Sequence, residues 1–186
     1  MNLWSPDIYA KAWEFATLAH QEQTYGGKTE GIKINYINHI GSVAMEVMNA
    51  IQLSSHHIDS NLAIQCALLH DIIEDTKFTY NDIKNKFGQN VADGVLALTK
   101  NEDISSKNLM MIDSLNRIKQ QPHEVWMVKM ADRICNLYHP PYYWNNKKIN
   151  SYREEAKTIF NNLNIANETL ANRLDNKIKD YESFLS

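Results

Sequence analysis

The sequence predicts an all-α fold. Apolar residues recur at helical spacing along most segments, no segment alternates apolar and polar residues as strands do, and cap-forming residues separate the helical stretches. The chain has 186 residues, of which 44% are hydrophobic and 22% charged. This is enough to bury one ordinary hydrophobic core without disulfides. We therefore expect a single domain over residues 1–186.

The first three helices are predicted from apolar periodicity. Apolar side chains recur every three or four residues within 7–22, 39–53 and 60–75, which is the spacing of one helix face. Residues 24–35 lie between the first two helices and contain three of the six glycines. We expect this stretch to be one long loop, and long loops in compact domains are often functional.

The later helices are predicted from their end signals. Thr79 and Asp82 form a capping pair that opens a short helix, and Gly88 ends it. A helix over residues 90–99 follows, and Ser105 or Ser106 is expected to cap the next one, which ends near residue 120. Pro122 suits the first position of a helix that runs to about residue 138. After the chain break at Pro140–Pro141, we expect helices near 148–163 and 166–184.

Composition argues against several classes of function. The net charge is −3 and there is no run of Lys or Arg, so neither nucleic acid nor a membrane surface is an expected partner. An anionic substrate would need a local basic group or a metal. Cys66 and Cys135 lie in apolar helical contexts and are expected to be buried thiols. With no signal-peptide pattern and no long apolar run, we expect a soluble cytoplasmic protein.

The strongest local signal is the segment ALLHDIIEDT at residues 67–76. Four ionisable groups lie within six residues of an otherwise apolar helix, and buried charges require a partner. Glu74 comes four residues after His70, and Asp75 four residues after Asp71. On a helix each such pair lies on the same side, one turn apart. His and Asp ligands suit Mn, Fe, Zn or Mg. The alternative is a helix end whose acids face solvent. The flanking Leu and Ile residues argue against it, because they are typical of a buried helix.

Two weaker signals lie elsewhere. In VKMADRICNL at residues 128–137, Asp132 and Asn136 share a helix face and could supply a ligand and a water-positioning amide. Alternatively, Asp132 pairs with Lys129 or Arg133 in a polar stripe. His39 follows the glycine-rich segment in YINH, and a lone His at a helix start is more often a cap or a core residue than a ligand.

Together these segments resemble a known family. The order His, then His-Asp, then Asp is similar to that of the HD superfamily of metal-dependent phosphohydrolases. The strings HQEQ, YINH, GSVA, ALLHDIIEDT, FG, LTK and VKMADRICNL resemble the small, single-domain alarmone hydrolases of the Rel/SpoT type. The resemblance covers about residues 8–163.

The resemblance implies an HD-type helical domain of about ten helices that holds one Mn²⁺ and removes pyrophosphate from the 3′ position of ppGpp or pppGpp, giving GDP or GTP. It implies four metal ligands: His39, His70, Asp71 and Asp132. Glu74 and Asp75 would activate or orient water, and Asn136 would hold the substrate or its ribose. The implied nucleotide contacts are Tyr36, Lys148 and Tyr152.

The chain departs from the family at three places. Ile40 stands where the family has proline, and Tyr138 where it has arginine. Thr24, Tyr25 and Gly26 replace basic residues, one of which stacks on guanine in the family. Tyr25 is the best-placed planar group here and Lys28 the nearest charge, so we expect both to contact substrate; alternatively, Tyr25 packs against the domain.

Two other readings stay open. The chain could hydrolyse another nucleotide, such as an adenine alarmone, NADPH or a nucleoside phosphate. It could also be a nucleotide-binding module without turnover, although the Glu74–Asp75 pair argues against this, because a binding module does not need water-activating acids. Association into a homo-oligomer is also left open by the sequence.

Overall fold

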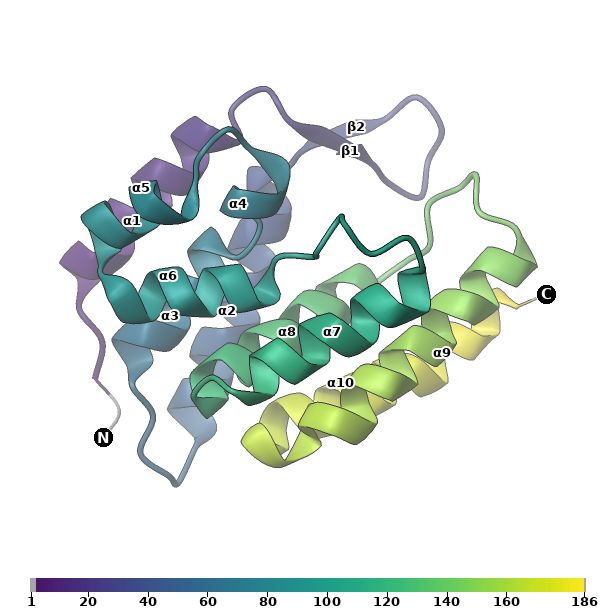
Figure 1. Cartoon of the computed structure of the whole chain (residues 1–186). Helices are drawn as coiled ribbons and strands as arrows, with labels where there is room; N and C mark the ends of the chain where they lie inside the picture. Colours follow the sequence, from purple (N-terminus) through teal and green to yellow (C-terminus); the bar gives the residue numbers. More distant parts are fainter. Residues whose placement is uncertain (1–2, 186) are drawn as a thin grey trace.

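The computed structural model describes residues 3–185 (Figure 1), so positions 1–2 and 186 of the predicted domain lie outside its described part. The described elements are, in chain order, α1 (Pro6–Ala19), β1 (Thr24–Gly26), β2 (Lys33–Asn35), α2 (Ile37–Leu53), α3 (Ser60–Leu69), α4 (Ile72–Asp75), α5 (Tyr80–Phe87), α6 (Gln89–Leu98), α7 (Lys107–Lys119), α8 (His123–Asn136), α9 (Asn146–Leu163), the 3₁₀ turn η1 (Asn164–Ala166), α10 (Glu168–Asp180) and η2 (Tyr181–Phe184). The predicted all-α class is confirmed.

The core lies where α2, α3 and α8 pack against one another. Each presents a broad face of small and branched apolar side chains, such as Val43, Ala63 and Ala131, which are fully buried. α1 and α6 cover α3, α10 covers α2 and α8, and α7 and α9 close the side of α8. Burial of these faces is the main force that holds the helices together, because apolar area removed from water is stabilising.

Helix starts follow the predicted capping signals. Thr79 and Asp82 form a reciprocal capping box at α5, and the Ser106 hydroxyl accepts a bond from the Leu109 amide at the start of α7. Ser106, and not Ser105, is therefore the cap. Gly88 separates α5 from α6 with a φ of 94°, a conformation that favours glycine.

The stretch 24–35, which was expected to be one long loop, forms a short β-hairpin, so the prediction missed its two strands. β1 and β2 pair antiparallel, with Tyr25 opposite Ile34. Each strand has three residues, which is too short for alternation to be visible in the sequence. The hairpin projects beside the segment between α8 and α9 (Figure 1), and the Tyr142 amide donates to the Gly27 carbonyl at 3.4 Å.

The predicted continuous helix at 60–75 was also wrong. α3 ends at Leu69, and α4 is a separate single turn that begins at Ile72. Asp71 between them has φ −101° and ψ 2°, outside the helical region. Consecutive residues of a regular helix point about 100° apart. The break turns the His70 and Asp71 side chains toward each other.

Other boundaries differ by a few residues. The first predicted helix, 7–22, ends at Ala19, and the last, 166–184, begins at Glu168 and tightens into the 3₁₀ turn η2 after Asp180. No helix among residues 3–185 combines the length and apolar character needed to cross a membrane.

A buried carboxylate joins α2 to the C-terminal helix. Glu46 is 2% exposed and accepts bonds from two nitrogens of the Arg173 guanidinium, which belongs to α10. The Tyr138 hydroxyl, just after α8, donates a third bond to Glu46 at 2.9 Å. Such pairing is what a buried charge requires, and it ties three segments together.

Close packing of α6 generates a stability prediction. A Cβ added at Gly94 would lie 2.8 Å from Cys66 Sγ and 2.9 Å from Val125 Cγ2. We expect Gly94→Ala to lower the free energy of unfolding by about 1–3 kcal/mol through overpacking, measured by denaturant unfolding. Gly41→Ala is the control, because there the new Cβ meets only the half-buried Trp13 ring at 3.3 Å. It should be neutral or stabilising, and equal stability of the two variants would contradict the packing argument.

Candidate active site

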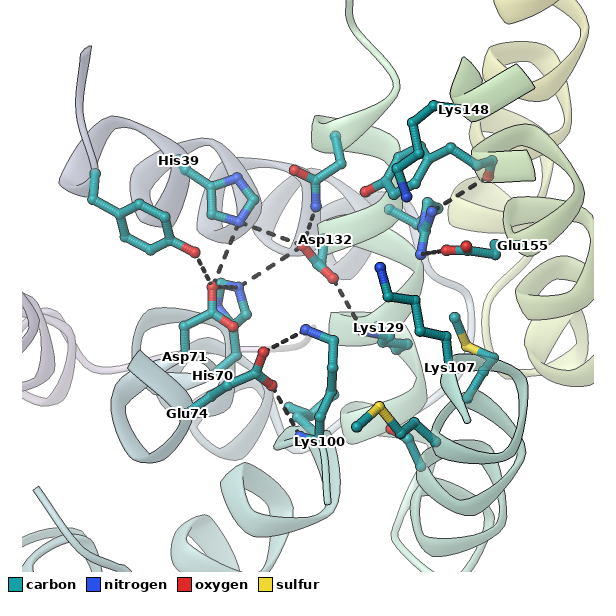
Figure 2. Close-up of a pocket in the computed structure, with 18 residues that line it drawn as sticks. His39, His70, Asp71, Glu74, Lys100, Lys107, Lys129, Asp132, Lys148 and Glu155 are labelled. Carbon is teal, nitrogen blue, oxygen red and sulfur yellow. Dashed lines mark hydrogen bonds and ion pairs between the residues drawn. The ribbon is translucent and has the colours of Figure 1, made fainter. Parts of the chain in front are cut away.

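Two histidines and two aspartates converge where the three core helices meet (Figure 2). His39 comes from the first turn of α2, His70 and Asp71 from the break after α3, and Asp132 from α8. His70 Nε2 lies 3.0 Å from Asp71 Oδ2 and 4.0 Å from Asp132 Oδ1. His39 Nε2 lies 3.8 Å from Asp71 Oδ2 and 3.4 Å from Asp132 Oδ1. The structure thus brings together all four residues that the sequence suggested as metal ligands.

The spacing of these atoms fits a shared metal ion. Two ligand atoms that each lie about 2.1 Å from one ion are at most about 4.2 Å apart. All four distances above satisfy this limit. Ligand atoms of His39, His70 and Asp132 lie within 4.8 Å of one another, and this buried group could hold a metal. Asp71 is outside that group of three, but its Oδ2 lies within 3.8 Å of both Nε2 atoms.

Neighbouring groups orient the four side chains. His70 Nδ1 donates to the Ala67 carbonyl at 2.8 Å, which leaves the Nε2 lone pair facing the cluster. This Nε2 is buried and makes no hydrogen bond of normal geometry. The Tyr36 hydroxyl donates to Asp71 at 2.5 Å, and Asn136 Nδ2 donates to Asp132 at 2.6 Å. Outer contacts of this kind fix the orientation and basicity of metal ligands.

The charges of the cluster shift its pKa values. Burial alone would lower the pKa of His70, but the carboxylates of Asp71 and Asp132 raise it to about 9. Burial opposes ionisation of Asp71, yet the nearby His70 holds the pKa of Asp71 below its usual range. Burial, followed by the charge of Asp71, raises the pKa of Tyr36. The two carboxylates therefore need positive charge beside them, which protons or a divalent cation can supply.

Glu74 and Asp75 follow the cluster but face different surroundings. Glu74 lines a cavity beside the cluster, and Lys100 holds its carboxylate through both the backbone amide and Nζ. Asp75 does not line this cavity and accepts a bond from Gln23 Nε2 at 3.3 Å. Burial, then the charges of Asp71 and Glu74, raise the pKa of Asp75. The two acids are consecutive residues of α4 and therefore point in different directions, as neighbours on a helix do.

A basic cavity of about 420 Å³ opens on one side of the cluster (Figure 2). Four carboxylates line it, and so do five cations: Lys100, Lys107, Lys129, Arg133 and Lys148. Three of these cations pair with carboxylates: Lys100 with Glu74, Lys129 with Asp132 and Arg133 with Glu155. The sequence offered this pairing of Asp132 with Lys129 as the alternative to a role of Asp132 as a metal ligand. Within residues 3–185, Lys107 and Lys148 line the cavity without a carboxylate at ion-pair distance.

An aromatic cavity of about 750 Å³ lies on the other side of the cluster. Its walls include the hairpin and the segment after α8, with six aromatic side chains: Tyr25, Tyr36, Tyr138, Tyr143, Trp144 and Tyr152. Lys28 and His139 also line it. The Tyr25 hydroxyl accepts a bond from Asn38, and its ring meets Tyr36 edge to face at 6.1 Å between centroids. Tyr25 thus both packs against the domain and borders the cavity.

The two cavities meet at the cluster, because Tyr36, His39, Asn136 and Tyr152 line both of them. Of the other residues suggested from the sequence, Lys148 lines the basic cavity, and Tyr25 and Lys28 line the aromatic one. The sequence reasoning missed the α7 wall, including Lys107 and Ser114. The Ser114 hydroxyl is buried and has no hydrogen-bond partner. No local sequence pattern marks these residues as part of a site, because they face the cavity only through the packing of α7 against α8.

The chain is similar to known proteins over most of its length. The family model of the HD domain matches residues 12–175. Guanosine-3′,5′-bis(diphosphate) 3′-pyrophosphohydrolase MESH1 of Xenopus tropicalis is 28% identical over 182 residues, covering 93% of this chain and 94% of its own. The human MESH1 is 26% identical and covers 91% of this chain and 92% of its own.

A solved structure has the same fold. It is described as that of a metazoan ortholog of SpoT that hydrolyses ppGpp, and it superimposes with a TM-score of 0.80 at 21% identity, covering 99% of both chains. The matching model spans most of the sequence and includes the four clustered residues. This chain therefore belongs to the HD domain family.

Proposed function

We propose that this protein is a metal-dependent hydrolase that removes the 3′-pyrophosphate of ppGpp or pppGpp, giving GDP or GTP and pyrophosphate. The cofactor is one Mn²⁺, held by His39, His70, Asp71 and Asp132. The main support is the meeting of a basic and an aromatic cavity at one candidate metal site. Curated relatives of similar length carry the name of this activity.

The two cavities suit the two parts of such a substrate. Aromatic rings give a flat surface on which a purine can stack, so the nucleoside belongs in the cavity bordered by Tyr25, Tyr143 and Trp144. The basic cavity has one more cation than it has carboxylates before any metal is counted. It suits the pyrophosphate, whose distal phosphate would lie against Lys107 and Lys148.

Hydrolysis at this junction needs little covalent chemistry from the protein. Water forms a bond to the proximal phosphorus, the bond from that phosphorus to the ribose O3′ breaks, and O3′ takes up a proton. A bound Mn²⁺ would lower the pKa of water and neutralise phosphate charge. Glu74 takes the proton from water. Asp75, which accepts a hydrogen bond from Gln23 next to the hairpin, helps to orient this water. Asn136 and Tyr152 lie at the junction of the cavities and hold the ribose.

The first prediction from the proposed function concerns the metal. His70→Ala and Asp132→Ala should each lose most of the bound Mn²⁺, because each removes a ligand from a buried charged cluster, as measured by elemental analysis of dialysed protein. Glu155→Gln is the control, since Glu155 lines the same basic cavity from α9 without approaching the cluster. Full metal content in both ligand variants would refute this site.

The second prediction concerns the reaction. Wild-type protein loaded with Mn²⁺ should release pyrophosphate from ppGpp and pppGpp, and Glu74→Gln should keep the metal while kcat falls about 10²–10⁴-fold. The substrate panel also contains ppApp, NADPH and dNTPs, with pyrophosphate and phosphate measured separately. Preference for ppApp, NADPH or dNTPs would point to another nucleotide. Binding without turnover of any of these would identify a binding module.

The third prediction separates the two cavities. Lys107→Ala should lower kcat/KM for ppGpp by about 10-fold or more, because it removes a charged hydrogen bond worth about 1.5–3 kcal/mol. It should have little effect on the same nucleotide with a 3′-monophosphate. Tyr25→Ala should raise KM for both about 5- to 150-fold, the factor for losing about 1–3 kcal/mol of stacking. Lys119→Ala, at the exposed far end of α7, is the control. Equal effects of Lys107→Ala on both substrates would contradict the placement of the distal phosphate.

A further inference from the structure

Arg117 lies on α7 but does not line the basic cavity. Its guanidinium binds the end of α6: Nη1 donates to the Leu96 and Ala97 carbonyls at 2.7 and 3.0 Å, and Nη2 donates to the Thr99 carbonyl at 2.7 Å. The last carbonyls of a helix have no partner within the helix, and a basic side chain can satisfy them. Asp113, one turn earlier, accepts from Arg117 Nε at 2.8 Å and fixes the plane of the guanidinium.

The residue that follows this anchored stretch holds Glu74. The Lys100 amide donates to Glu74 Oε2 at 2.9 Å, and Lys100 Nζ binds Oε1 of the same carboxylate (Figure 2). Both oxygens of Glu74 are thus held by one residue. Lys100 directly follows Thr99, and Arg117 binds the carbonyl of Thr99.

Glu74 needs an external anchor, because α4 is a single turn of four residues. A helix this short has little stability of its own. α4 packs against α6, and the Lys100–Glu74 contact is on that side. The position of the Glu74 carboxylate therefore depends on where α6 ends.

We propose that Arg117 is a positioning residue for Glu74: by fixing the carbonyls of Leu96, Ala97 and Thr99, it sets the place of Lys100 and, through it, of the acid beside the cluster. This inference rests on the proposed function, since it takes Glu74 as the group that acts on water. A displacement of about 1 Å in a reacting group can cost about 100-fold in rate.

The test compares Arg117→Met, Glu74→Gln and the double variant. Arg117→Met should lower kcat by up to about 100-fold while KM and Mn²⁺ content stay within about twofold of wild type. The double variant should be no slower than Glu74→Gln alone, because residues that act through one another have non-additive effects. If the two losses multiply, or if Arg117→Met leaves kcat unchanged, the proposal is overturned.

A matched control separates positioning from general stability. Arg153 also binds a carbonyl near the end of a helix, that of Ile178 in α10 at 2.9 Å, and pairs with Glu182 at 2.7 Å, away from the cavities. Arg153→Met should reduce thermal stability without lowering kcat. A loss of kcat equal to that of Arg117→Met would overturn the proposal. Arg117→Lys, which keeps the charge but loses the fork of donors, should also lower kcat and serves if Arg117→Met does not fold.

A second readout needs neither substrate nor metal. Hydrogen exchange of the Lys100 amide should be slow in wild type, because this amide is bonded to Glu74, and faster in Arg117→Met. Unchanged exchange would overturn the positioning link. If wild type hydrolyses none of the nucleotide panel but the exchange still accelerates, the proposed function fails while the link from Arg117 to Lys100 stands.

Discussion

The packing of α2, α3 and α8 must accommodate two carboxylates and two imidazoles at the place where these helices meet. A buried charge is costly unless it is paired and hydrogen-bonded. Tyr36, Asn136 and Lys129 supply bonds to the two aspartates from α8 and from the residue before α2. The three helices that form the hydrophobic core therefore also bring the candidate site together at their junction.

The arrangement around the cluster divides charged from aromatic groups. α7, α8 and α9 bring lysines and arginine to one side, and the hairpin and the segment after α8 bring tyrosines and tryptophan to the other. The bond from the Tyr142 amide to the Gly27 carbonyl links the two walls of the aromatic side. A ligand with a planar end and a highly charged end would find complementary surfaces on either side of the cluster.

Distant arginines support this arrangement from outside. Arg117 satisfies the end of α6, and Arg173 satisfies the buried Glu46, which in turn holds Tyr138 at the aromatic cavity. The guanidinium suits both tasks because its planar fork offers several donors at fixed angles. Residues that line neither of these two cavities thus bind the segments that carry residues lining them.

The local sequence pattern determined the helical class, most helix starts and the pair His70 and Asp71, whereas His39 and Asp132 were expected as ligands only from the resemblance to the family. Apolar spacing and caps are local properties, and a His-Asp pair within an apolar helix is visible without tertiary information. It also carried the resemblance to the family, which the match over residues 12–175 supports.

Tertiary structure decided the rest. The break at Asp71 and the three-residue strands of the hairpin follow from contacts that no local pattern records. The hydrogen-bond partners of Glu74 and Asp75 are Lys100 and Gln23, which lie 26 and 52 residues away from them in the chain. Lys107 and Ser114 enter the cavity only because α7 packs beside α8. Packing between distant segments chooses which polar side chains face a cavity, whereas periodicity predicts only which side chains face the core.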